Sequence, residues 1–424
     1  MDTPKLTRTR GRVFIISIIV VLLIPVLAAG MLHQPSDNTG DPNQVSGNET
    51  GEIMFIAFQG KFNTIDDNTG RLVALDRETK TVIWEHKQHR RYFDVDPIDK
   101  NTILFSATRD LSNGESDRVA IVMNWRTGEV KDKFVIPKDT HDIDYLGDGK
   151  YAIADKASHK AYILDRNTDE TVWQFRFADH FSEKAGDGIN GDYTHLNDID
   201  SVNNGSAFLV SPRNFDRVML INRSTNQVEW VLGEEDNYDI LYEQHNPVLL
   251  SQDPPTVLVA DSENDRIVEY QKKGQEWELT WSYYGQLNWP RDADRLPNGN
   301  TLIVDSNGDR VVEVTPDREV VWELAIRENP YDAELLKYGD EPQGPPMTEF
   351  KSEFGSPIPE DHSQSHALSP LFDAFDSAYY LAQWVLPSWI DKIQFLFLLA
   401  AGGVLISWLT AEAVIKIPLD RVRK

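Results

Sequence analysis

The sequence predicts an all-β fold, a six-bladed β-propeller flanked by an N-terminal and a C-terminal transmembrane helix. A pattern of short strands and polar turns recurs about six times at spacings of roughly 40 to 55 residues, the size of one four-stranded blade. Most copies start with x-Asp-φ-Asp, where φ is apolar, and close on Trp, and an uncharged apolar stretch lies near each end of the chain. A β-sandwich, the alternative, explains neither the recurrent start nor the recurrent Trp.

The N-terminal region combines a basic end with an apolar stretch. Residues 1–12 contain four basic residues, and the apolar stretch 13–32 contains no charged residue. About 20 apolar residues span a bilayer, and a cleaved signal peptide usually has a shorter apolar region. We therefore expect an uncleaved transmembrane helix over 13–32. A flexible linker over 33–51, rich in Asp, Asn, Gly, Pro and Ser, should follow it.

The propeller is expected over residues 52–335. Its clearest copy starts at Arg291-Asp-Ala-Asp294, continues through strands that end at Asp305 and begin at Arg310, and closes at Trp322. Apolar and polar residues alternate along these strands, and Gly, Asn and Asp fill the turns. The first copy begins at Met54, and the first five copies close at Trp84, Phe134, Trp173, Trp230 and Trp281.

The C-terminal region is predicted to return to the membrane. A Pro-rich, irregular segment covers 336–378, an aromatic segment typical of a membrane interface covers 379–390, and a second transmembrane helix covers 391–415. The tail, 416–424, is basic like the N-terminus. Because positive flanks stay in the cytoplasm, we expect a two-pass protein of the cell membrane with both termini cytoplasmic and the propeller outside.

The charge balance excludes one class of partner. The chain has 68 Asp and Glu against 42 Lys and Arg, a net charge of −26, so nucleic acid is not expected to bind. The acidity is spread over every blade, which favours a halophilic source, and an acidic secreted protein is the alternative. The absence of cysteine from the sequence excludes disulfides and thiolate metal sites.

No metal site and no cofactor are expected. Several histidines fall in the repeats, and imidazole is a common metal ligand. However, no H-x-H or H-E-x-x-H spacing occurs, and no carboxylate is evidently placed as a third ligand. Asp261–Asp265 and Asp305–Asp309 have some likeness to calcium loops, but hairpin turns explain them better.

Polar residues at equivalent repeat positions form a candidate site. The innermost strand of each blade lines the channel, so residues at the strand starts should form a ring at its mouth. The residues at this position are Phe93, His141, Asn197, His245 and Arg291. His195 lies two residues before Asn197, and Arg213 follows a strand whose counterparts end in Asp. Cationic and amide donors stabilise an oxyanion, and neutral imidazole is a nucleophile or base, which indicates an anion pocket. Purely structural histidines are the alternative.

Short motifs resemble those of the aryl-sulfate sulfotransferase family, whose members are six-bladed propellers. The family has H-x-N, S-x-R followed by W-x-L-G, and Q-H, in this order. The matching segments are Thr194-His195-Leu-Asn197, Ser211-Pro-Arg213 followed by Val228-Glu-Trp-Val-Leu-Gly233, and Gln244-His245. Members move a sulfuryl group from a phenolic sulfate ester to another phenol, through a covalent sulfo-histidine and without the nucleotide donor PAPS.

The resemblance implies a role for each candidate residue. His245 would be the nucleophile. Three residues would hold the sulfate oxygens: His195, Asn197 and Arg213. His141, which matches a further channel histidine of some members, would be an accessory residue. We expect Arg291 to be a second accessory residue, because Arg291 occupies the same repeat position as His141.

Departures from the family leave the acceptor open. The extra N-terminal β-domain and the disulfide of the periplasmic bacterial members are missing, and two apolar anchors are added. The expected function is therefore a membrane-anchored sulfotransferase that faces outside. Its donor would be an aryl sulfate, and its acceptor a phenol or a glycan or lipid hydroxyl at the surface. The alternative from another class is a non-catalytic propeller that serves as a binding scaffold on the envelope.

Overall fold

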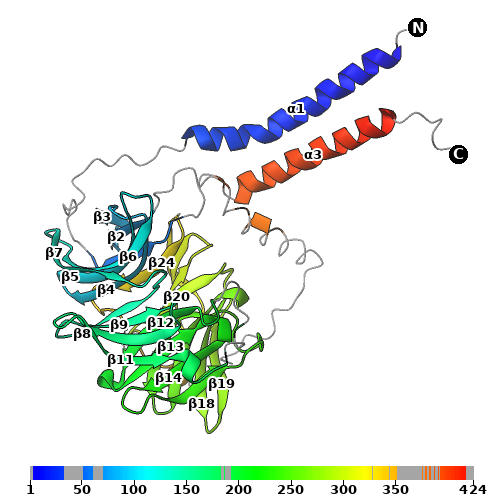
Figure 1. Ribbon diagram of the computed structural model, residues 1–424. Helices are drawn as coiled ribbons and strands as arrows, with labels where there is room; N and C mark the ends of the chain where they lie inside the picture. Colours follow the sequence, from blue (N-terminus) through cyan, green and yellow to red (C-terminus); the bar gives the residue numbers. More distant parts are fainter. Residues whose placement is uncertain are drawn as a thin grey trace. The chain divides into compact units, whose positions relative to one another are not determined.

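The structure is a computed structural model that describes residues 3–32, 51–60, 70–182, 186, 192–326, 328–342, 344–350, 375, 378–379, 382, 386, 390 and 392–416. These residues belong to two compact units. The strands build one unit, and the helices α1 (Thr3–Leu32) and α3 (Lys392–Lys416) belong to the other (Figure 1).

Five sheets of the strand unit follow the chain from their innermost to their outermost strand, and each has four antiparallel strands. The first two consist of β4 (Arg91–Asp99), β5 (Thr102–Asp110), β6 (Ser116–Asn124) and β7 (Glu129–Ile136), and of β8 (Ile143–Gly147), β9 (Lys150–Asp155), β10 (Lys160–Asp165) and β11 (Glu170–Arg176). The third consists of β12 (Leu196–Val202), β13 (Ala207–Pro212), β14 (Arg217–Asn222) and β15 (Gln227–Gly233). The last two consist of β16 (His245–Gln252), β17 (Pro255–Asp261), β18 (Arg266–Lys273) and β19 (Glu276–Tyr283), and of β20 (Pro290–Arg295), β21 (Thr301–Asp305), β22 (Arg310–Val314) and β23 (Val320–Ala325).

The sixth sheet joins the two ends of the repeat region. Its innermost strand, β24 (Pro330–Leu335), pairs antiparallel with β1 (Ile53–Phe58), and β2 (Arg71–Asp76) and β3 (Thr81–His86) follow outward. The copy that begins at Met54 therefore supplies only three strands of its blade, and the end of the region supplies the fourth. This pairing of the first strand with the last closes the ring. The six-bladed all-β propeller predicted from the sequence is confirmed.

The recurrent closing Trp lies on the outermost strand and ties its blade to the next one. The indole Nε1 of Trp173 donates to the carbonyl oxygen of Arg223 at 2.9 Å. Trp322 does the same across the ring closure, to the carbonyl oxygen of Arg77 at 3.1 Å. Trp suits this position because it combines a large apolar face with a single hydrogen-bond donor.

The chain packs on the propeller after β24. The backbone N–H of Met347 donates to both carboxylate oxygens of Glu269, at 3.0 and 3.1 Å. Arg295, which forms a fully buried ion pair with Glu269 at 3.0 Å, also donates to the carbonyl oxygen of Pro345. The 3-10 helix η6 (Met347–Phe350) follows. The first part of the predicted Pro-rich segment therefore lies on the propeller, while residues 351–374 lie outside the described residues.

The helices form where the two transmembrane helices are predicted, and they lie side by side and antiparallel. Arg12, near the start of α1, donates Nε and Nη2 to the two carboxylate oxygens of Glu412, near the end of α3, both at 2.8 Å. Within the described residues, one helical stretch is long and apolar enough to cross a bilayer: Ile393–Glu412 in α3, with a mean hydropathy of 1.9. The apolar stretch of α1, Arg12–Leu27, is shorter. The membrane crossing of both helices stays a prediction.

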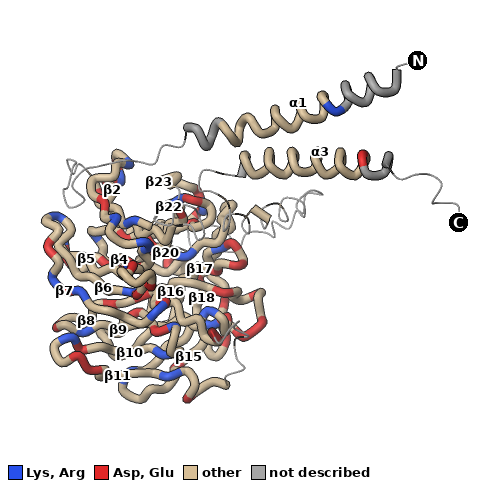
Figure 2. The backbone as a smooth tube through the Cα atoms, turned by 45° about the horizontal axis from the view of Figure 1, so that its top comes forward, with Lys and Arg blue, Asp and Glu red and all other residues tan. Residues whose placement is uncertain are grey.

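Two further sequence features can be placed. Acidic positions are spread over the whole propeller, as the sequence indicates (Figure 2). The charged residues of α1 all lie in its first third, up to Arg12, and those of α3 lie at its two ends. Three predicted segments fall wholly or largely outside the described residues: 33–50 of the linker, Trp384 and Trp389 of the interfacial segment, and 417–424 of the tail.

Candidate active site

A β-bulge recurs at the start of the inner strands. The pairing register shifts there in β4, β12, β16, β20 and β24. A bulge inserts one unpaired residue and re-aims its side chain. In β4 and β20 the inserted residues are Phe93 and Arg291, and in β24 it is Tyr331. The shift in β12 includes Asn197, and the shift in β16 begins at His245. Three of the predicted ring residues, Phe93, Asn197 and Arg291, are therefore bulge residues, while His245 is paired with Ala260 at the edge of its bulge and His141 precedes β8.

Tyr331 is a member of this ring that the sequence analysis missed. Tyr331-Asp332-Ala333-Glu334 repeats the start pattern with an acid in the last place, so the signal was present. It stands after the last closing Trp, where no further blade was expected, and it becomes a blade start only through ring closure. The hydroxyphenyl ring contacts His141, with ring centroids 5.8 Å apart.

The residue two positions before the ring is left-handed in five blades. Its φ is +43° at His195 and +46° at Glu243. The other three residues, with φ of +61°, +55° and +55°, are Asp139, Trp289 and Asn329. Left-handed backbone costs a residue with a side chain roughly 1 to 2 kcal/mol, so its recurrence marks a tight turn built into the repeat. This turn lets His195 and Asn197 of one blade both lie in the candidate site.

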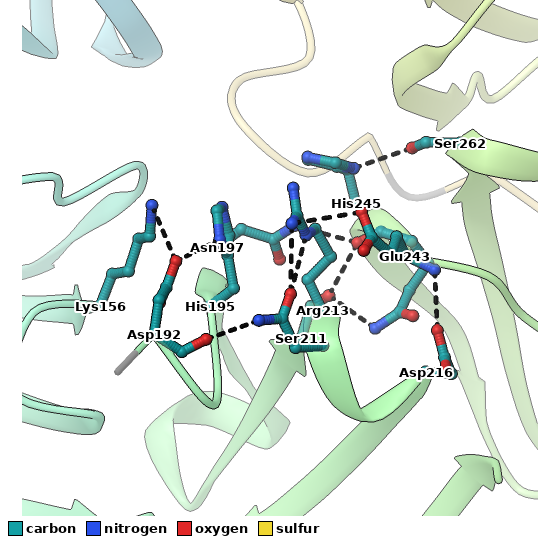
Figure 3. A network of polar contacts seen from close by, with 12 residues as sticks. Lys156, Asp192, His195, Asn197, Ser211, Arg213, Asp216, Glu243, His245 and Ser262 are labelled. Atoms are coloured by element: carbon teal, nitrogen blue, oxygen red, sulfur yellow. Dashed lines mark hydrogen bonds and ion pairs between the residues drawn. The ribbon is translucent and has the colours of Figure 1, made fainter. Parts of the chain in front are cut away.

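His195 is held by Asp192 in a defined tautomer. Its Nδ1 lies 2.7 Å from Asp192 Oδ2, and Lys156 Nζ lies 3.3 Å from the same oxygen (Figure 3). Burial opposes ionisation of Asp192, but the hydrogen bond from His195 and the charge of Lys156 prevail and lower the pKa of Asp192 to about 2. Burial, with Arg213 and Lys156, lowers the pKa of His195 to about 3. Asp192 is thus an anion that only accepts, so His195 is neutral, with its proton on Nδ1 and a lone pair on Nε2.

His245 has the same tautomer for a different reason. Its Nδ1 lies 2.8 Å from the hydroxyl oxygen of Ser262, at the start of the 3-10 helix η5 (Ser262–Asn264). Ser262 donates its own proton to the carbonyl oxygen of Pro290 at 2.7 Å. A hydroxyl has one proton, so Ser262 must accept from His245 Nδ1. Burial and the charge of Arg291 lower the pKa of His245 well below its usual value, so the imidazole is neutral and Nε2 keeps its lone pair.

Asn197 and Gln244 join the two histidine-bearing strands. Asn197 Nδ2 donates to the carbonyl oxygen of Gln244 at 2.9 Å, and the Asn197 side chain is buried. Gln244 Nε2 donates to the hydroxyl of Ser211 and to the carbonyl oxygen of Arg217, at 3.1 and 2.6 Å. Asn197 thus fixes the residue next to His245. Gln244 and Ser211, for which the sequence indicated no role, therefore help to hold the strand start that bears His245.

Arg213 opens onto a cavity of about 320 Å³ that His195 also lines. Arg213 begins the 3-10 helix η4 (Arg213–Phe215), and its Nη2 lies 3.2 Å from Glu243 Oε2. Tyr238 and Tyr242 line the cavity and stack with ring centroids 4.0 Å apart. The carboxylates of the lining are Asp192, Asp216, Asp236 and Glu243. The cavity therefore offers one guanidinium, an aromatic surface and an acidic wall.

His141 and Arg291 lie among aromatic rings. His141 stacks on Phe93 with centroids 5.5 Å apart and meets the ring of His195 edge-on at 5.4 Å. The guanidinium of Arg291 lies 4.4 Å from the centre of the Tyr331 ring. The structure thus brings His141 into direct contact with His195. Arg291 reaches the same aromatic cluster, and its charge acts on His245.

Arg118, on β6, is a further cation that the sequence analysis missed. Each of the strands β10, β18 and β22 begins with a cation that forms an ion pair with the Asp at the end of the preceding strand. Arg310, for example, lies 2.7 Å from Asp305. Arg118 pairs opposite Thr108 instead. Its guanidinium lies 3.5 Å from the centre of the Phe93 ring, and its Nη1 is buried without a hydrogen-bond partner among the described residues. Burial lowers the pKa of Arg118 to about 9, so it is charged at neutral pH.

The arrangement suits chemistry on a tetrahedral anion. Two neutral imidazoles each keep a lone pair on Nε2, and guanidinium groups lie beside them. Among the described side chains, the groups close enough to share a metal ion are three sets of carboxylates, and none of these sets includes a site histidine. The candidate chemistry at the mouth is therefore that of imidazole and guanidinium.

Comparisons with known proteins agree with the motifs. A sequence model of the family described as Arylsulfotransferase (ASST) matches residues 66–282, just over half of the chain. No curated protein matches it. One similar solved structure is a protein of unknown function from Bacteroides caccae, with 17% identity, 65% of this chain and 94% of that chain covered, and a TM-score of 0.46. Another is the periplasmic gluconolactonase PpgL from Pseudomonas aeruginosa, with 11% identity, coverages of 69% and 88%, and a TM-score of 0.46.

Proposed function

Because the chain belongs to the arylsulfotransferase family, we propose that it moves a sulfuryl group from an aryl sulfate to a phenol through a sulfo-histidine at His245. The observation that carries this proposal is the tautomer of His245. The Ser262 hydroxyl accepts a hydrogen bond from Nδ1–H, so the proton stays on Nδ1 and Nε2 presents the lone pair that a nucleophile needs. The position of His245 in the Gln-His motif supports the same assignment.

In the first half-reaction, His245 Nε2 attacks the sulfur of the donor. The N–S bond forms, the S–O bond to the aryl group breaks, and the phenolate leaves with the bonding electron pair. A phenol with a pKa near 10 leaves as its anion without a strong acid. The Nδ1 proton stays on the ring, where the Ser262 hydroxyl accepts it and stabilises the positive sulfo-imidazole.

In the second half-reaction, we assign His195 the role of base. A neutral His195 with its proton on Nδ1 would direct a lone pair at a sulfate oxygen, which is repulsive. It can instead take the phenolic proton of the acceptor on Nε2, and Asp192 stabilises the imidazolium that forms. The acceptor oxygen attacks sulfur, and the N–S bond breaks with its electron pair returning to His245.

The positive groups stabilise the transferring sulfuryl group. Its transition state resembles that of phosphoryl transfer, which is loose and spreads charge over three equatorial oxygens. Arg213 and Arg118 have the charge and the donors for these oxygens. Asn197 already donates to Gln244, so we assign it a positioning role in place of direct sulfate binding. His141 and Arg291 remain accessory residues in this proposal.

The cavity beside Arg213 is the proposed binding site for the aromatic part of a substrate. Tyr238 and Tyr242 present rings on which an aryl group can stack. Asp216 holds the segment that bears them, accepting from the backbone N–H of Asp236 at 3.2 Å and of Glu243 at 2.9 Å. Because carboxylates line this cavity, we propose that the acceptor is a neutral or cationic phenol, or a neutral glycan hydroxyl, and not a carboxylate-bearing phenol.

The proposed location is the outer face of the cell membrane of a halophile. The apolar stretch of α3, the apolar part of α1 and the basic flanks in the sequence support two membrane anchors with cytoplasmic ends. The acidity spread over the blades supports a high-salt surrounding. An acceptor embedded in or attached to the envelope would then be within reach.

The test uses the full-length protein in detergent and high salt, with p-nitrophenyl sulfate as donor and phenol as acceptor. We expect transfer with ping-pong kinetics and, without acceptor, a mass increase of one sulfuryl group on the peptide that contains His245. His245→Ala should abolish both. If His195→Ala abolishes the adduct and His245→Ala does not, the nucleophile is His195. If neither substitution changes anything and no transfer occurs, the scaffold function stands.

A further inference from the structure

The channel below the site is lined with buried acids. Five of the six blades have two acids, two residues apart, on or just before the innermost strand. The pairs are Asp94 and Asp96, Asp142 and Asp144, Asp198 and Asp200, Asp292 and Asp294, and Asp332 and Glu334. The sixth inner strand, β16, has no acid at the equivalent positions. In the sequence, this x-Asp-φ-Asp pattern marks the start of the blades. In three dimensions it becomes a double ring of carboxylates around the axis.

Backbone hydrogen bonds explain only part of this ring. Asp332 Oδ2 accepts from the N–H of Val95 at 2.8 Å, and Asp94 Oδ2 accepts from Ile143 at 3.2 Å, so the first acid of a blade ties it to the next blade. Each of these contacts uses one oxygen of its carboxylate. Several other carboxylate oxygens of the double ring are buried without a hydrogen-bond partner among the described residues. They include Asp198 Oδ2, Asp200 Oδ2, Asp292 Oδ2 and Glu334 Oε2, on side chains that are 4% to 6% exposed.

These unpartnered oxygens have no protein cation beside them. None of the ion pairs within the described residues involves an acid of the double ring. Burial and the neighbouring carboxylates raise the pKa of Asp198 and Asp200 well above the usual range. Burying several carboxylates together without a counter-charge is strongly unfavourable, and buried charges are normally paired or bound to a metal ion.

The spacing of the oxygens fits a calcium ion. In one group, Asp142, Asp198 and Asp200 each offer an oxygen within 4.8 Å of the others. Two ligands of one Ca²⁺ at about 2.4 Å each lie at most about 4.8 Å apart, so these oxygens can share one ion. Ca²⁺ also accepts irregular sets of carboxylate oxygens, whereas Mg²⁺ demands a near-regular octahedron and usually keeps several waters. The donors are oxygens only, which excludes the softer metals.

We propose that the channel of this propeller binds Ca²⁺, with Asp142, Asp198 and Asp200 as one group of ligands. Asp292, Asp332 and Glu334 form a second group, also with oxygens within 4.8 Å of one another, from the blades on the other side of the ring. A bound ion neutralises the acids and joins neighbouring inner strands. It also supports the site, because Asp142 follows His141 in sequence and Asp198 follows Asn197.

An opening from the far mouth of the channel gives the ion a route. A cavity of about 900 Å³ lies there, at the ends of the inner strands opposite to the site, and Asp144, Ser201, Asp340 and Glu341 line it. Asp340 also lies within 4.8 Å of Asp96 and Asp144, measured between carboxylate oxygens. The segment after β24 thus adds acids to the mouth through which a cation would enter.

The experiment measures calcium content and melting temperature of the full-length protein in detergent. After EDTA treatment, return of Ca²⁺ and dialysis, we expect at least one calcium per chain by elemental analysis. Calcium at about 100 times its dissociation constant should raise Tm by roughly 5 °C. Absence of retained calcium together with an unchanged Tm would overturn the proposal, and an equal shift with Mg²⁺ would overturn the choice of ion.

A substitution separates ion binding from simple repulsion. Without calcium, Asp200→Asn should melt at or above the wild-type temperature, because one ionisable carboxyl is removed from the crowded acidic ring. With calcium the order should reverse, and the affinity should fall at least 10-fold. Glu276→Gln, at an exposed position on β19, is the matched control and should keep the wild-type response. If Asp200→Asn fails to fold, Glu334→Gln tests the second group in the same way. If both variants keep the wild-type calcium response, the proposal is wrong.

Discussion

His245 Nδ1–H donates a hydrogen bond to the hydroxyl oxygen of Ser262, 2.8 Å away, and the Ser262 hydroxyl donates a hydrogen bond to the carbonyl oxygen of Pro290. These two hydrogen bonds leave one possible tautomer for His245. Ser306 occupies the equivalent position of the next blade and donates to the carbonyl oxygen of Pro330 in the same way, with no histidine attached. The repeat thus contains a structural hydroxyl at this place, and one copy of it orients the proposed nucleophile.

Ser262→Ala is expected to lower kcat roughly 10- to 100-fold with little change in KM, by analogy with outer partners that orient functional histidines. Without the hydroxyl, the Nδ1 proton can move to Nε2 and remove the nucleophile. Steady-state kinetics measure the effect. Ser306→Ala removes the equivalent hydroxyl and should keep kcat, so an equal loss in both variants would mean that Ser262 acts only on stability.

Arg213→Ala is expected to leave slow residual transfer. It removes one charge from the sulfuryl oxygens, which by analogy with oxyanion-hole deletions costs roughly 10²- to 10³-fold in kcat. Arg213→Lys should rescue poorly, because an ammonium group cannot make a two-pronged contact to sulfate oxygens. Full activity of Arg213→Lys would show that only the charge matters. Wild-type activity of Arg213→Ala would remove Arg213 from the mechanism.

The pH profile should lack a step at the usual pKa of histidine. Burial lowers the pKa of His195 from 6.5 to about 3, with Asp192, Lys156, Arg213 and His141 facing it. A group with a lowered pKa stays neutral until the pH falls to that value, so His195 remains a base from pH 8 to pH 5. We expect kcat/KM to be flat across this window. A tenfold fall between pH 7 and pH 6 would show that the imidazole titrates normally.

Acceptor preference should follow the charge of the cavity. A phenol with an ammonium substituent should be used with a lower KM than the same phenol with a carboxylate, because four carboxylates line the cavity. Tyr242→Ala should raise KM for the acceptor roughly 2- to 10-fold through loss of an aromatic contact. Tyr242→Phe keeps the ring and should behave like the wild type. A preference for anionic phenols would place the acceptor elsewhere.

The proposed topology can be tested on intact cells. Protease added outside should degrade the propeller and spare an epitope placed after Lys424, because both basic ends are expected in the cytoplasm. Lysed cells provide the control in which both are degraded. A propeller that resists protease in intact cells but not in lysed cells would reverse the orientation.

The sequence predicts the blade architecture because each blade repeats its own signals. The closing Trp and the polar turns are local, so six blades follow from counting them. The counting does not predict which strands make up the blade that contains β24, because its inner strand pairs with β1, at the other end of the repeat region. Tyr331 was missed for the same reason.

The candidate site was only partly readable. His195 and His245 follow from their motifs, but Arg118 lies on a third strand, outside the aligned starts. Thr108 stands opposite Arg118 where other blades have an Asp, and the guanidinium lies over the ring of Phe93 instead. The amide of Asn197 faces a backbone carbonyl, a contact that depends on how two blades pack. Such contacts between blades leave no pattern in a single copy of the repeat.

The pairing of β24 with β1 has a consequence for the order of folding. Met54 lies opposite Leu335, so one blade cannot be completed until nearly the whole propeller has been synthesised. Until then β1 exposes an unpaired edge, which other strands can bind. Contacts between such distant residues also slow folding. A chain that stops before Pro330 should therefore give an open ring prone to aggregation, even though every proposed catalytic residue is already present.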